Sequence, residues 1–131
     1  MTATSPPNGN RPRVVVVDDH PTFRTAARML LERRGYAVVG EAGCGASAVD
    51  AVERQAPDAV LLDVRLGADD GFAVCRALTE TRPELAVLLA SDGTVQDAEQ
   101  LVASSGARGF VPKSRLTEID FREFWPPPEQ A

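Results

Sequence analysis

The stretch RVVVVDDHPT, residues 13–22, says most about the fold, because a run of four valines leads directly into two acidic residues. Apolar β-branched residues in an unbroken run predict a strand that is buried on both faces. Asp18 and Asp19 then place two like charges at the end of that strand, where a nearby apolar interior raises the cost of ionising both. The acidic pair therefore needs a compensating cation.

The rest of the chain alternates short apolar runs with longer segments of helical period, which is typical of parallel βαβ units. Pro57, Pro83 and Gly106 lie at or beyond three helix ends, where a helix cannot easily continue or needs a permissive backbone. The pattern predicts an α/β fold built as a (βα)₅ sheet. We expect strands at 14–18, 37–42, 59–64, 85–90 and 109–112, and helices at 21–34, 46–55, 71–81, 95–105 and 117–125.

The length of 131 residues fits one domain with a single core. Residues 1–12 are rich in Pro, Gly, Asn and Thr, and we expect them to form a disordered N-terminal tail. The folded domain is expected at 13–125. Residues 126–131 are expected to be a proline-rich tail or the start of a linker.

Composition narrows the class of protein. Hydrophobic residues make up 44% and charged residues 25%, which is an ordinary balance for a soluble globular protein. No apolar run approaches the roughly 20 residues that span a bilayer, and the N-terminus lacks the apolar segment of a secretory signal, so we expect a cytoplasmic protein without a membrane partner. The 14 basic and 19 acidic residues give a net charge of −5, which argues against direct binding to nucleic acid.

The two cysteines, Cys44 and Cys75, form no pair with metal-binding spacing and are too few for a disulfide framework. We expect both to be reduced and chemically inert thiols.

Polar side chains gather where the predicted strands end. The first strand ends in Asp18 and Asp19, the third in Asp63, the fourth in Ser91, and the fifth is followed by Lys113. Ligands of open parallel sheets bind outside the carboxyl ends of the strands, so these groups are expected to converge on one rim. Each residue alone has a common explanation as a turn former or a solvated surface group. Their joint placement on successive strand ends predicts a functional site.

The chemistry of these strand-end residues predicts a site that acts on a phosphoryl group. Oxygen ligands in a partly open site suit a hard divalent cation such as Mg²⁺, with Mn²⁺ as the substitute. Asp63 follows a rigid apolar strand and is placed to act as a nucleophile, which would form an aspartyl phosphate. Lys113 and Ser91 would then contact phosphoryl oxygens.

Four stretches resemble the receiver domain of two-component response regulators, and the resemblance covers about residues 13–120. They are VVVVDDH (14–20), VLLDVRLGADDG (60–71), LLASD (88–92) and SSGARGFVPKS (104–114). The DDH opening and the KS ending are most similar to the subfamily whose members often carry a helix-turn-helix output domain. The resemblance implies a flavodoxin-like fold, a three-layer sandwich around a five-stranded parallel sheet of order 2-1-3-4-5.

The resemblance also implies residue roles at the acidic end of the site. Asp63 would accept a phosphoryl group from a histidine kinase or a phosphotransfer protein. Asp19 would bind Mg²⁺ or Mn²⁺ directly, and Asp18 would do so mainly through water. Asp63 and the backbone carbonyl of Arg65 would complete the protein ligands.

The remaining roles concern the switch. The resemblance implies that Lys113 contacts the phosphoryl group, that Ser91 turns toward it, and that Phe110 follows as an aromatic switch. The surface of the fourth helix, fifth strand and fifth helix would then change its preference for a downstream protein partner, a fused output domain or a second copy in a phosphorylation-dependent homodimer. Such a protein is a signalling phosphoacceptor rather than an enzyme, with at most slow self-catalysed phosphorylation and dephosphorylation.

Three positions depart from the family pattern. Ser114 stands where the family commonly has a proline in a cis peptide, so a trans bond is expected after Lys113. Asp92 stands where a small residue is usual, and Arg65 occupies a position whose side chain can screen an acyl phosphate from water. We hypothesise that Arg65 and Asp92 pair across the mouth of the site and alter the lifetime of the phosphoryl group.

The segment GCGASA, residues 43–48, supports a different interpretation, because it fits the glycine-rich turn of a dinucleotide-binding unit, with Asp63 placed 20 residues on as a ribose ligand. Against this dinucleotide interpretation, Glu41 and Ala42 separate the turn from the apolar strand, and the chain is short for two mononucleotide-binding halves.

The segment DDHPT, residues 18–22, is faintly similar to the D-x-D-x-T loop of aspartate-nucleophile phosphohydrolases, but His20 replaces the second aspartate. A third interpretation is a receiver-like interaction module that is never phosphorylated, for which Asp92 and Ser114 are the reasons. His20 itself is interpreted as a solvent-facing group at a helix start, although it could instead be a metal ligand beside Asp19.

Overall fold

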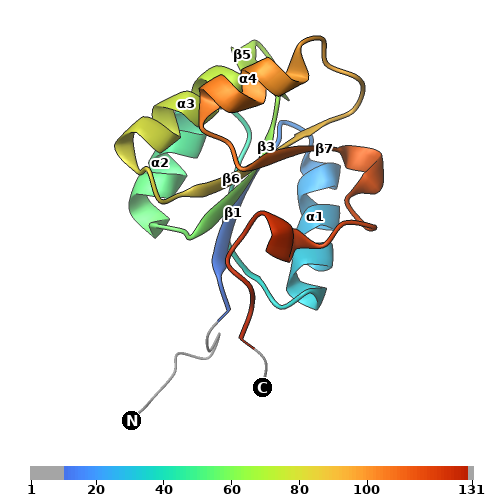
Figure 1. Ribbon diagram of the computed structural model, residues 1–131. Coiled ribbons are helices and arrows are strands. Elements are labelled where there is room, and N and C mark those ends of the chain that lie inside the picture. The colour runs from blue at the N-terminus through green and yellow to red at the C-terminus, as the bar shows by residue number, and fades with distance from the viewer. Residues whose placement is uncertain (1–10, 130–131) are drawn as a thin grey trace.

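The computed structural model describes residues 11–129, in which five long strands alternate with four helices (Figure 1). The strands are β1 (Arg13–Val17), β2 (Ala37–Ala42), β3 (Ala59–Asp63), β6 (Ala86–Ser91) and β7 (Gly109–Pro112), with two short strands, β4 (Arg65–Leu66) and β5 (Asp69–Asp70), between β3 and α3. The helices are α1 (Pro21–Arg33), α2 (Gly45–Gln55), α3 (Gly71–Thr81) and α4 (Ala98–Ser105), and two 3-10 turns follow, η1 (Lys113–Arg115) and η2 (Phe121–Glu123).

The long strands form one parallel sheet of order β2-β1-β3-β6-β7. Numbered by the long strands alone, this is the predicted order 2-1-3-4-5, and the flavodoxin-like fold is confirmed. The strand order reverses between β1 and β3, which pair from Val14 with Ala59 to Val17 with Leu62. The carboxyl ends of these two strands are where such a sheet binds its ligands.

Two apolar layers enclose the sheet, one on each face. Figure 1 shows α2, α3 and α4 on one side of the sheet, and α1 with the C-terminal segment on the other. Val15 and Val17 belong to the layer under α2 and α3, whereas Val14 and Val16 belong to the layer under α1. Successive strand residues point to opposite faces, so the four valines fill both layers and explain the unbroken apolar run.

The predicted helix at 117–125 is wrong, because this part of the chain forms only the turns η1 and η2. The Arg34 guanidinium donates to the carbonyls of Thr117 at 2.6 Å and Ile119 at 2.9 Å, so these carbonyls are taken by a distant side chain. Asp120 accepts from the Arg122 amide at 3.0 Å and fixes the turn η2. The spacing of Phe121 and Trp125 suggested a helix, yet only one helical turn joins them, from the Trp125 amide to the Phe121 carbonyl.

The remaining predicted elements are present with small shifts at their ends. The largest concerns α4, which begins at Ala98 rather than at residue 95, because Asp97 before it has a left-handed backbone with φ of 59°. Pro12 was assigned to the N-terminal tail, yet it is buried and its carbonyl accepts from the Ala37 amide at 2.9 Å. The predicted tail residues 1–10 and 130–131 lie outside the described residues, and 126–129 contain no helix or strand.

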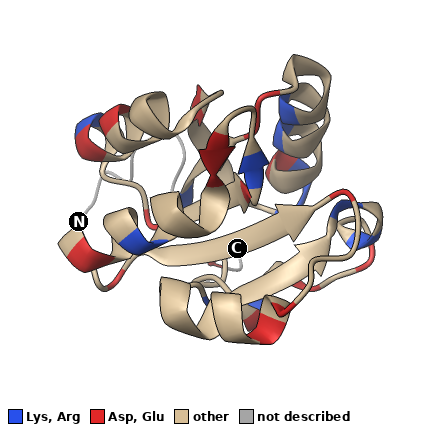
Figure 2. Ribbon diagram, turned by 90° about the horizontal axis from the view of Figure 1, so that it is seen from above, with Lys and Arg blue, Asp and Glu red and all other residues tan. Residues whose placement is uncertain are grey.

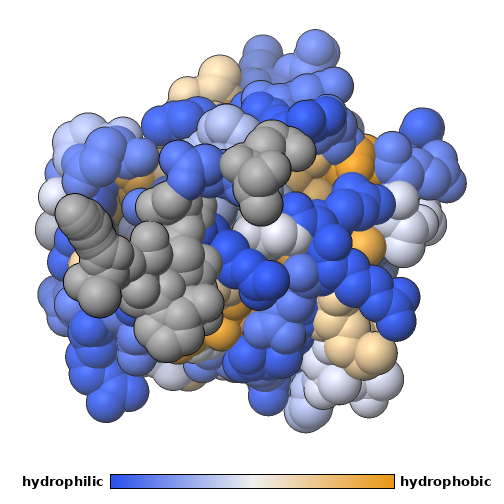
Figure 3. Space-filling view, turned by 90° about the horizontal axis from the view of Figure 1, so that it is seen from below, coloured by the Kyte–Doolittle hydropathy of each residue, from blue (hydrophilic) through white to orange (hydrophobic). Residues whose placement is uncertain are grey.

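Figure 3 shows a lower face that is mainly hydrophilic, with only small separated apolar areas among the described residues. Within residues 11–129, no helix is both long enough and apolar enough to cross a bilayer.

Candidate functional site

The predicted strand-end residues meet at the carboxyl edge of the sheet. In Figure 2 the charged positions lie mainly on the helices, loops and short strands, while the long strands are largely free of colour. Asp18, the first residue after β1, has a fully buried side chain, and Asp63, the last residue of β3, is 5% exposed. Two carboxylates are thus buried at neighbouring strand ends. The chain leaves strand geometry after Val17, as the sequence requires if Asp18 and Asp19 are both to reach the edge.

Lys113 supplies positive charge beside these two carboxylates. Its Nζ lies 2.6 Å from Asp18 Oδ2 and 3.2 Å from Asp63 Oδ2. The ammonium also lies 4.3 Å from the centre of the Phe23 ring on α1, where it gains a cation–π interaction. Sequence reasoning missed Phe23, although its position at the start of the helix after the acidic pair is a signal that it lies at this edge.

The charges at this edge shift the pKa values of Asp63 and Lys113. Burial raises the pKa of Asp63, and Asp18 raises it further, whereas hydrogen bonds from the Arg65 amide and Lys113 lower it; the net shift is upward. Burial lowers the pKa of Lys113, but Asp18 and Asp63 raise it more, so the net shift is again upward. Lys113 is therefore a charged partner at neutral pH.

Asp19 and His20 complete the acidic end of the site. The Asp19 side chain is 32% exposed, and its Oδ1 atom is buried without a hydrogen-bond partner among the described residues. Ligand atoms of Asp18, Asp19, His20 and Asp63 all lie within 4.8 Å of one another. An orphaned carboxylate oxygen beside two further carboxylates fits a hard divalent cation, so the residues present suit Mg²⁺ or Mn²⁺.

The loop after Asp63 is held against the start of α3. The Arg65 amide donates to Asp63 Oδ1 at 3.1 Å, and β4 and β5 form a small antiparallel ribbon. The Gly71 amide donates to the Val64 carbonyl at 2.7 Å, and a Cβ atom at Gly71 would collide with the Asp63 carbonyl. This close approach explains the glycine eight residues after Asp63. The Arg65 carbonyl as a metal ligand stays a prediction.

Ser91 and Asp92 line a cavity beside Asp63. This cavity of about 220 Å³ is also lined by Arg65, Gly93, Thr94 and Val95. The Ser91 hydroxyl donates to the Gly93 carbonyl at 3.0 Å and accepts from the Gly93 amide at 3.3 Å. It is therefore turned toward its own loop and makes no hydrogen bond to Asp63 or Lys113 in the described chain.

The hypothesis that Arg65 and Asp92 form an ion pair is wrong. No ion pair joins them in residues 11–129, and the Asp92 carboxylate, 77% exposed, lies 3.8 Å from Lys113 Nζ instead. The buried ammonium attracts this extra acid, whereas the Arg65 guanidinium stays in solvent.

Two further predictions concern the Phe110 side chain and the peptide bond after Lys113. Phe110 on β7 is half-buried beside α4, where it lines a cavity of about 420 Å³ with Ala98, Glu99, Val102 and Ala103. The part of the chain that the structure describes contains no cis peptide bond, so the trans bond expected between Lys113 and Ser114 is confirmed.

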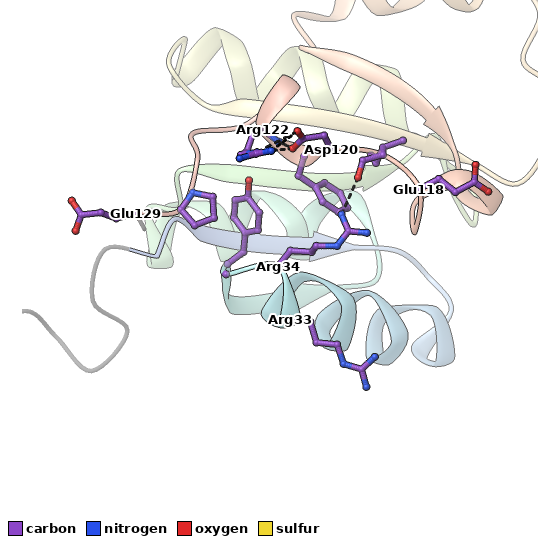
Figure 4. Close-up of a pocket in the computed structure, with 11 residues that line it drawn as sticks. Arg33, Arg34, Glu118, Asp120, Arg122 and Glu129 are labelled. Carbon is purple, nitrogen blue, oxygen red and sulfur yellow. Dashed lines mark hydrogen bonds and ion pairs between the residues drawn. The ribbon is translucent and has the colours of Figure 1, made fainter. Parts of the chain in front are cut away.

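A separate cavity of about 580 Å³ lies beside η2 and the end of α1, away from these residues (Figure 4). Most of its charged side chains form hydrogen bonds or ion pairs with other groups of the protein. Arg34 binds two carbonyls, and Arg122 forms a bidentate pair with Asp120, with Nη2 2.9 Å from Asp120 Oδ2. Figure 4 shows Arg33 extending away from the other labelled side chains. This cavity contains none of the predicted site residues.

The glycine-rich turn at 43–48 is not a dinucleotide site. The Gly45 amide at the start of α2 donates to Asp69 Oδ2 at 2.9 Å, so an internal carboxylate lies where a pyrophosphate would bind. The dinucleotide interpretation is therefore wrong. The thiol of Cys44, which precedes this helix, is exposed, and that of Cys75 is buried; both are free.

The family model of the response regulator receiver domain matches residues 14–120. This chain belongs to that family and is a receiver domain of two-component signalling systems. The phosphohydrolase interpretation is therefore wrong, and the never-phosphorylated interaction module is not favoured.

Similar proteins agree with this assignment. The chain is 38% identical over 117 residues to the probable transcriptional regulatory protein NarL of Mycobacterium tuberculosis, covering 88% of this chain and 54% of that protein. It is 32% identical over 102 residues to the response regulator GacA of Pseudomonas aeruginosa, covering 77% and 48%. The chain thus spans about half the length of the curated relatives it matches.

Solved structures show the same fold. The signal receiver domain of NarL from Mycobacterium tuberculosis superposes with a TM-score of 0.74 at 35% identity, covering 87% of this chain and 90% of that one. A two-component response regulator of the LuxR family from Aurantimonas superposes with a TM-score of 0.75 at 32% identity, covering 79% and 75%.

Proposed function

We propose that Asp63 is the phosphoacceptor of this receiver domain and takes its phosphoryl group from a phosphohistidine of a histidine kinase or a phosphotransfer protein. The observation that carries the proposal is the buried Asp63 carboxylate, paired with Lys113 at 3.2 Å and open to a cavity of about 220 Å³. A carboxylate oxygen attacks the phosphorus while the phosphorus–nitrogen bond breaks, and the electron pair of that bond goes to the departing imidazole.

Asp18, Asp19, Asp63 and the backbone carbonyl of Arg65 would hold a Mg²⁺ or Mn²⁺ ion at this site. When bound, the ion supplies positive charge that neutralises phosphoryl oxygens. Lys113 Nζ carries a proton and donates a hydrogen bond to Asp63 Oδ2. In the phosphorylated protein this ammonium would donate to a phosphoryl oxygen on Asp63 instead. The orphaned Asp19 Oδ1 supports the metal assignment.

The switch that follows involves Ser91 and Phe110. To reach a phosphoryl oxygen, the Ser91 hydroxyl has to leave the Gly93 carbonyl and amide, so its loop exchanges two hydrogen bonds for one that is charge-assisted. Phe110 then has room to repack beside α4, where it lines a cavity. The two arrangements form a two-state equilibrium that phosphorylation biases.

The output surface consists of α4, β7 and the segment 113–125, because no fifth helix is present in the described residues. We infer that this surface controls a partner protein or a fused output domain in the cytoplasm. Support comes from the relatives, which are described as transcriptional regulators and are about twice as long as the matched region.

The test of phosphorylation is intact-protein mass spectrometry after incubation with acetyl phosphate and Mg²⁺. The expected result is a gain of one phosphoryl group that is absent in Asp63→Asn. Asp69→Asn is the matched control, because Asp69 lies in the loop that follows and contacts Gly45 rather than Lys113. The absence of any gain in the unmodified protein would instead favour the interaction module.

Arg65 and Asp92 are proposed as modulators of the phosphoryl lifetime that act separately, since no ion pair joins them. Arg65→Ala should change the dephosphorylation rate by exposing the acyl phosphate to water, and an unchanged rate would exclude that role. Asp92→Asn should change the rate by its own factor. The double variant tests this independence: a product of the two factors supports it, whereas a departure from the product would show coupling through the cavity that both residues line.

A further inference from the structure

The Phe23 ring, in the first turn of α1, contacts the ammonium of Lys113, which follows β7. The centre of the ring lies 4.3 Å from Lys113 Nζ, well within the distance of about 6 Å at which a ring face attracts a cation. The ring is partly buried and packs against the apolar layer under α1, so the fold sets its position. Phe23 therefore presents a fixed aromatic surface to the cation of the site.

This contact matters because several acids compete for the same ammonium. Lys113 Nζ lies 2.6 Å from Asp18 Oδ2 and 3.2 Å from Asp63 Oδ2. The exposed carboxylate of Asp92 lies 3.8 Å from the same atom. A lysine carries its charge on a flexible four-carbon stem, so its backbone alone does not fix which acid it meets. The Lys113 side chain is only 9% exposed, and a cation–π interaction is stronger in such a shielded place than at the surface.

We infer that Phe23 is a positioning residue for the phosphorylation of Asp63, because its ring keeps the Lys113 ammonium where it can donate to a phosphoryl oxygen. This inference rests on the proposed function of Asp63. A phenyl ring has no group that could bind a phosphoryl oxygen or transfer a proton, so Phe23 acts through Lys113. Without the attraction of the ring, the ammonium spends less time beside Asp63, and phosphorylation is slower.

The contact itself can be observed without metal or phosphorylation, because Lys113 is the only lysine in the sequence. Protein that contains isotope-labelled lysine gives a single set of lysine side-chain signals in nuclear magnetic resonance spectra. Protons above a ring face are shifted upfield, so the ε-methylene protons of Lys113 should lie upfield of those of an exposed lysine. Phe23→Leu, which keeps an apolar side chain without a ring, should return them to the exposed value. An exposed value in the unmodified protein would contradict the inference.

A fluorinated series at position 23 separates the attraction of the ring from its shape. Each fluorine withdraws electron density from the ring face and changes the volume of the side chain little. The sequence contains five phenylalanines, so amber suppression is used to place the fluorinated residue at Phe23 alone. Mono-, di- and trifluorophenylalanine should slow phosphorylation by acetyl phosphate and Mg²⁺ step by step, to a total of about fivefold, which corresponds to about 1 kcal/mol.

Trifluorophenylalanine at Phe124 is the matched control. The Phe124 ring lies against Gly109, the first residue of β7, whereas Lys113 follows the last residue of that strand. The same chemical change at Phe124 should therefore leave the phosphorylation rate unchanged. Equal slowing at both positions would show that the fluorinated ring only loosens the core, and it would overturn the inference.

The outcomes separate this inference from the proposed function. An upfield Lys113 signal that is lost in Phe23→Leu, together with rates that fall with each added fluorine, supports the inference. If Asp63 is phosphorylated at the same rate across the whole fluorinated series, the inference is wrong and the proposed function stands. If the unmodified protein takes up no phosphoryl group, the proposed function fails and the inference fails with it.

Discussion

The carboxyl edge of the sheet and the C-terminal segment 114–128 stabilise the protein by opposite means. At the edge, buried charges face one another: Lys113 is within 3.2 Å of both Asp18 and Asp63. In the segment, aromatic rings pack together, with the ring centres of Phe121 and Trp125 5.0 Å apart and those of Tyr36 and Trp125 5.3 Å apart.

The two regions obtain their shapes in different ways. Each side chain at the edge is placed by the strand that carries it, since regular backbone fixes where a strand-end residue points. The segment has little regular backbone and depends on the side chains of Arg34 and Tyr36, in the turn between α1 and β2, to hold it. Changes in the segment should therefore reduce stability without altering the chemistry of the edge, whereas changes at the edge should alter both.

The largest effect is expected from Trp125→Ala in the segment. Trp125 is buried, and its removal leaves a cavity between Tyr36 and Phe121, which should lower the free energy of unfolding by about 3–5 kcal/mol. Urea unfolding measures the loss. Trp125→Phe is the matched variant and should cost less than Trp125→Ala, because the indole Nε1 has no hydrogen-bond partner in the described chain. A loss below about 1 kcal/mol in Trp125→Ala would show that the segment is not anchored by this ring.

At the edge, Lys113→Met should lower the free energy of unfolding by about 3 kcal/mol at pH 7, because Asp18 stays buried without a cation. The pKa of Lys113 is raised above its ordinary 10.5, so its contribution is present below that pH and is lost as the pH rises through the folded value.

The control for this effect is the double variant Asp18→Asn with Lys113→Met, which removes the buried charge together with its partner. It should recover most of the stability. A double variant as unstable as Lys113→Met alone would contradict the account.

The link between α1 and the segment gives an intermediate effect. Arg34→Met removes two charged hydrogen bonds to the carbonyls of Thr117 and Ile119 and should cost about 2 kcal/mol. The side chain of the neighbouring Arg33 is exposed and makes no hydrogen bond or ion pair within residues 11–129, so Arg33→Met is a matched control and should stay within about 0.5 kcal/mol. Equal effects of the two variants would mean that Arg34 does not hold the segment.

The smallest effect is expected from Asp63→Asn, which should raise the free energy of unfolding at pH 7 by less than any of the losses above. The folded pKa of Asp63 is raised above its ordinary 3.8, so the folded protein binds the proton more tightly and stability falls as the pH rises between these two values. Asparagine removes this loss, and Lys113 keeps Asp18 as a partner. Unfolding at pH 3 and pH 7 tests the sign: the gain should vanish at pH 3, and a variant less stable at pH 7 would contradict it.

Most of the fold could be predicted because its signals are local. Four valines before Asp18 and AVLL before Asp63 place two central strands, and Gly71 marks the close approach of α3 to the loop after Asp63. The helix at 117–125 was predicted wrongly because the prediction rested on the spacing of apolar residues alone. It could not take account of Arg34, which binds two carbonyls of this segment from more than 80 residues away in the sequence. The pairing of Arg65 with Asp92 was wrong because Lys113 is the nearer cation.

Periodicity and spacing along the chain were enough to predict the central strands and the carboxyl edge at which the polar residues gather, and the resemblance of four stretches predicted the receiver family. What those residues contact became clear only in three dimensions: Lys113 with Asp18 and Phe23, His20 against the acidic pair, and Arg34 with the C-terminal segment. The two kinds of information differ because a strand fixes the position of its own residues, whereas a long charged side chain selects its partner from whatever the fold brings within reach.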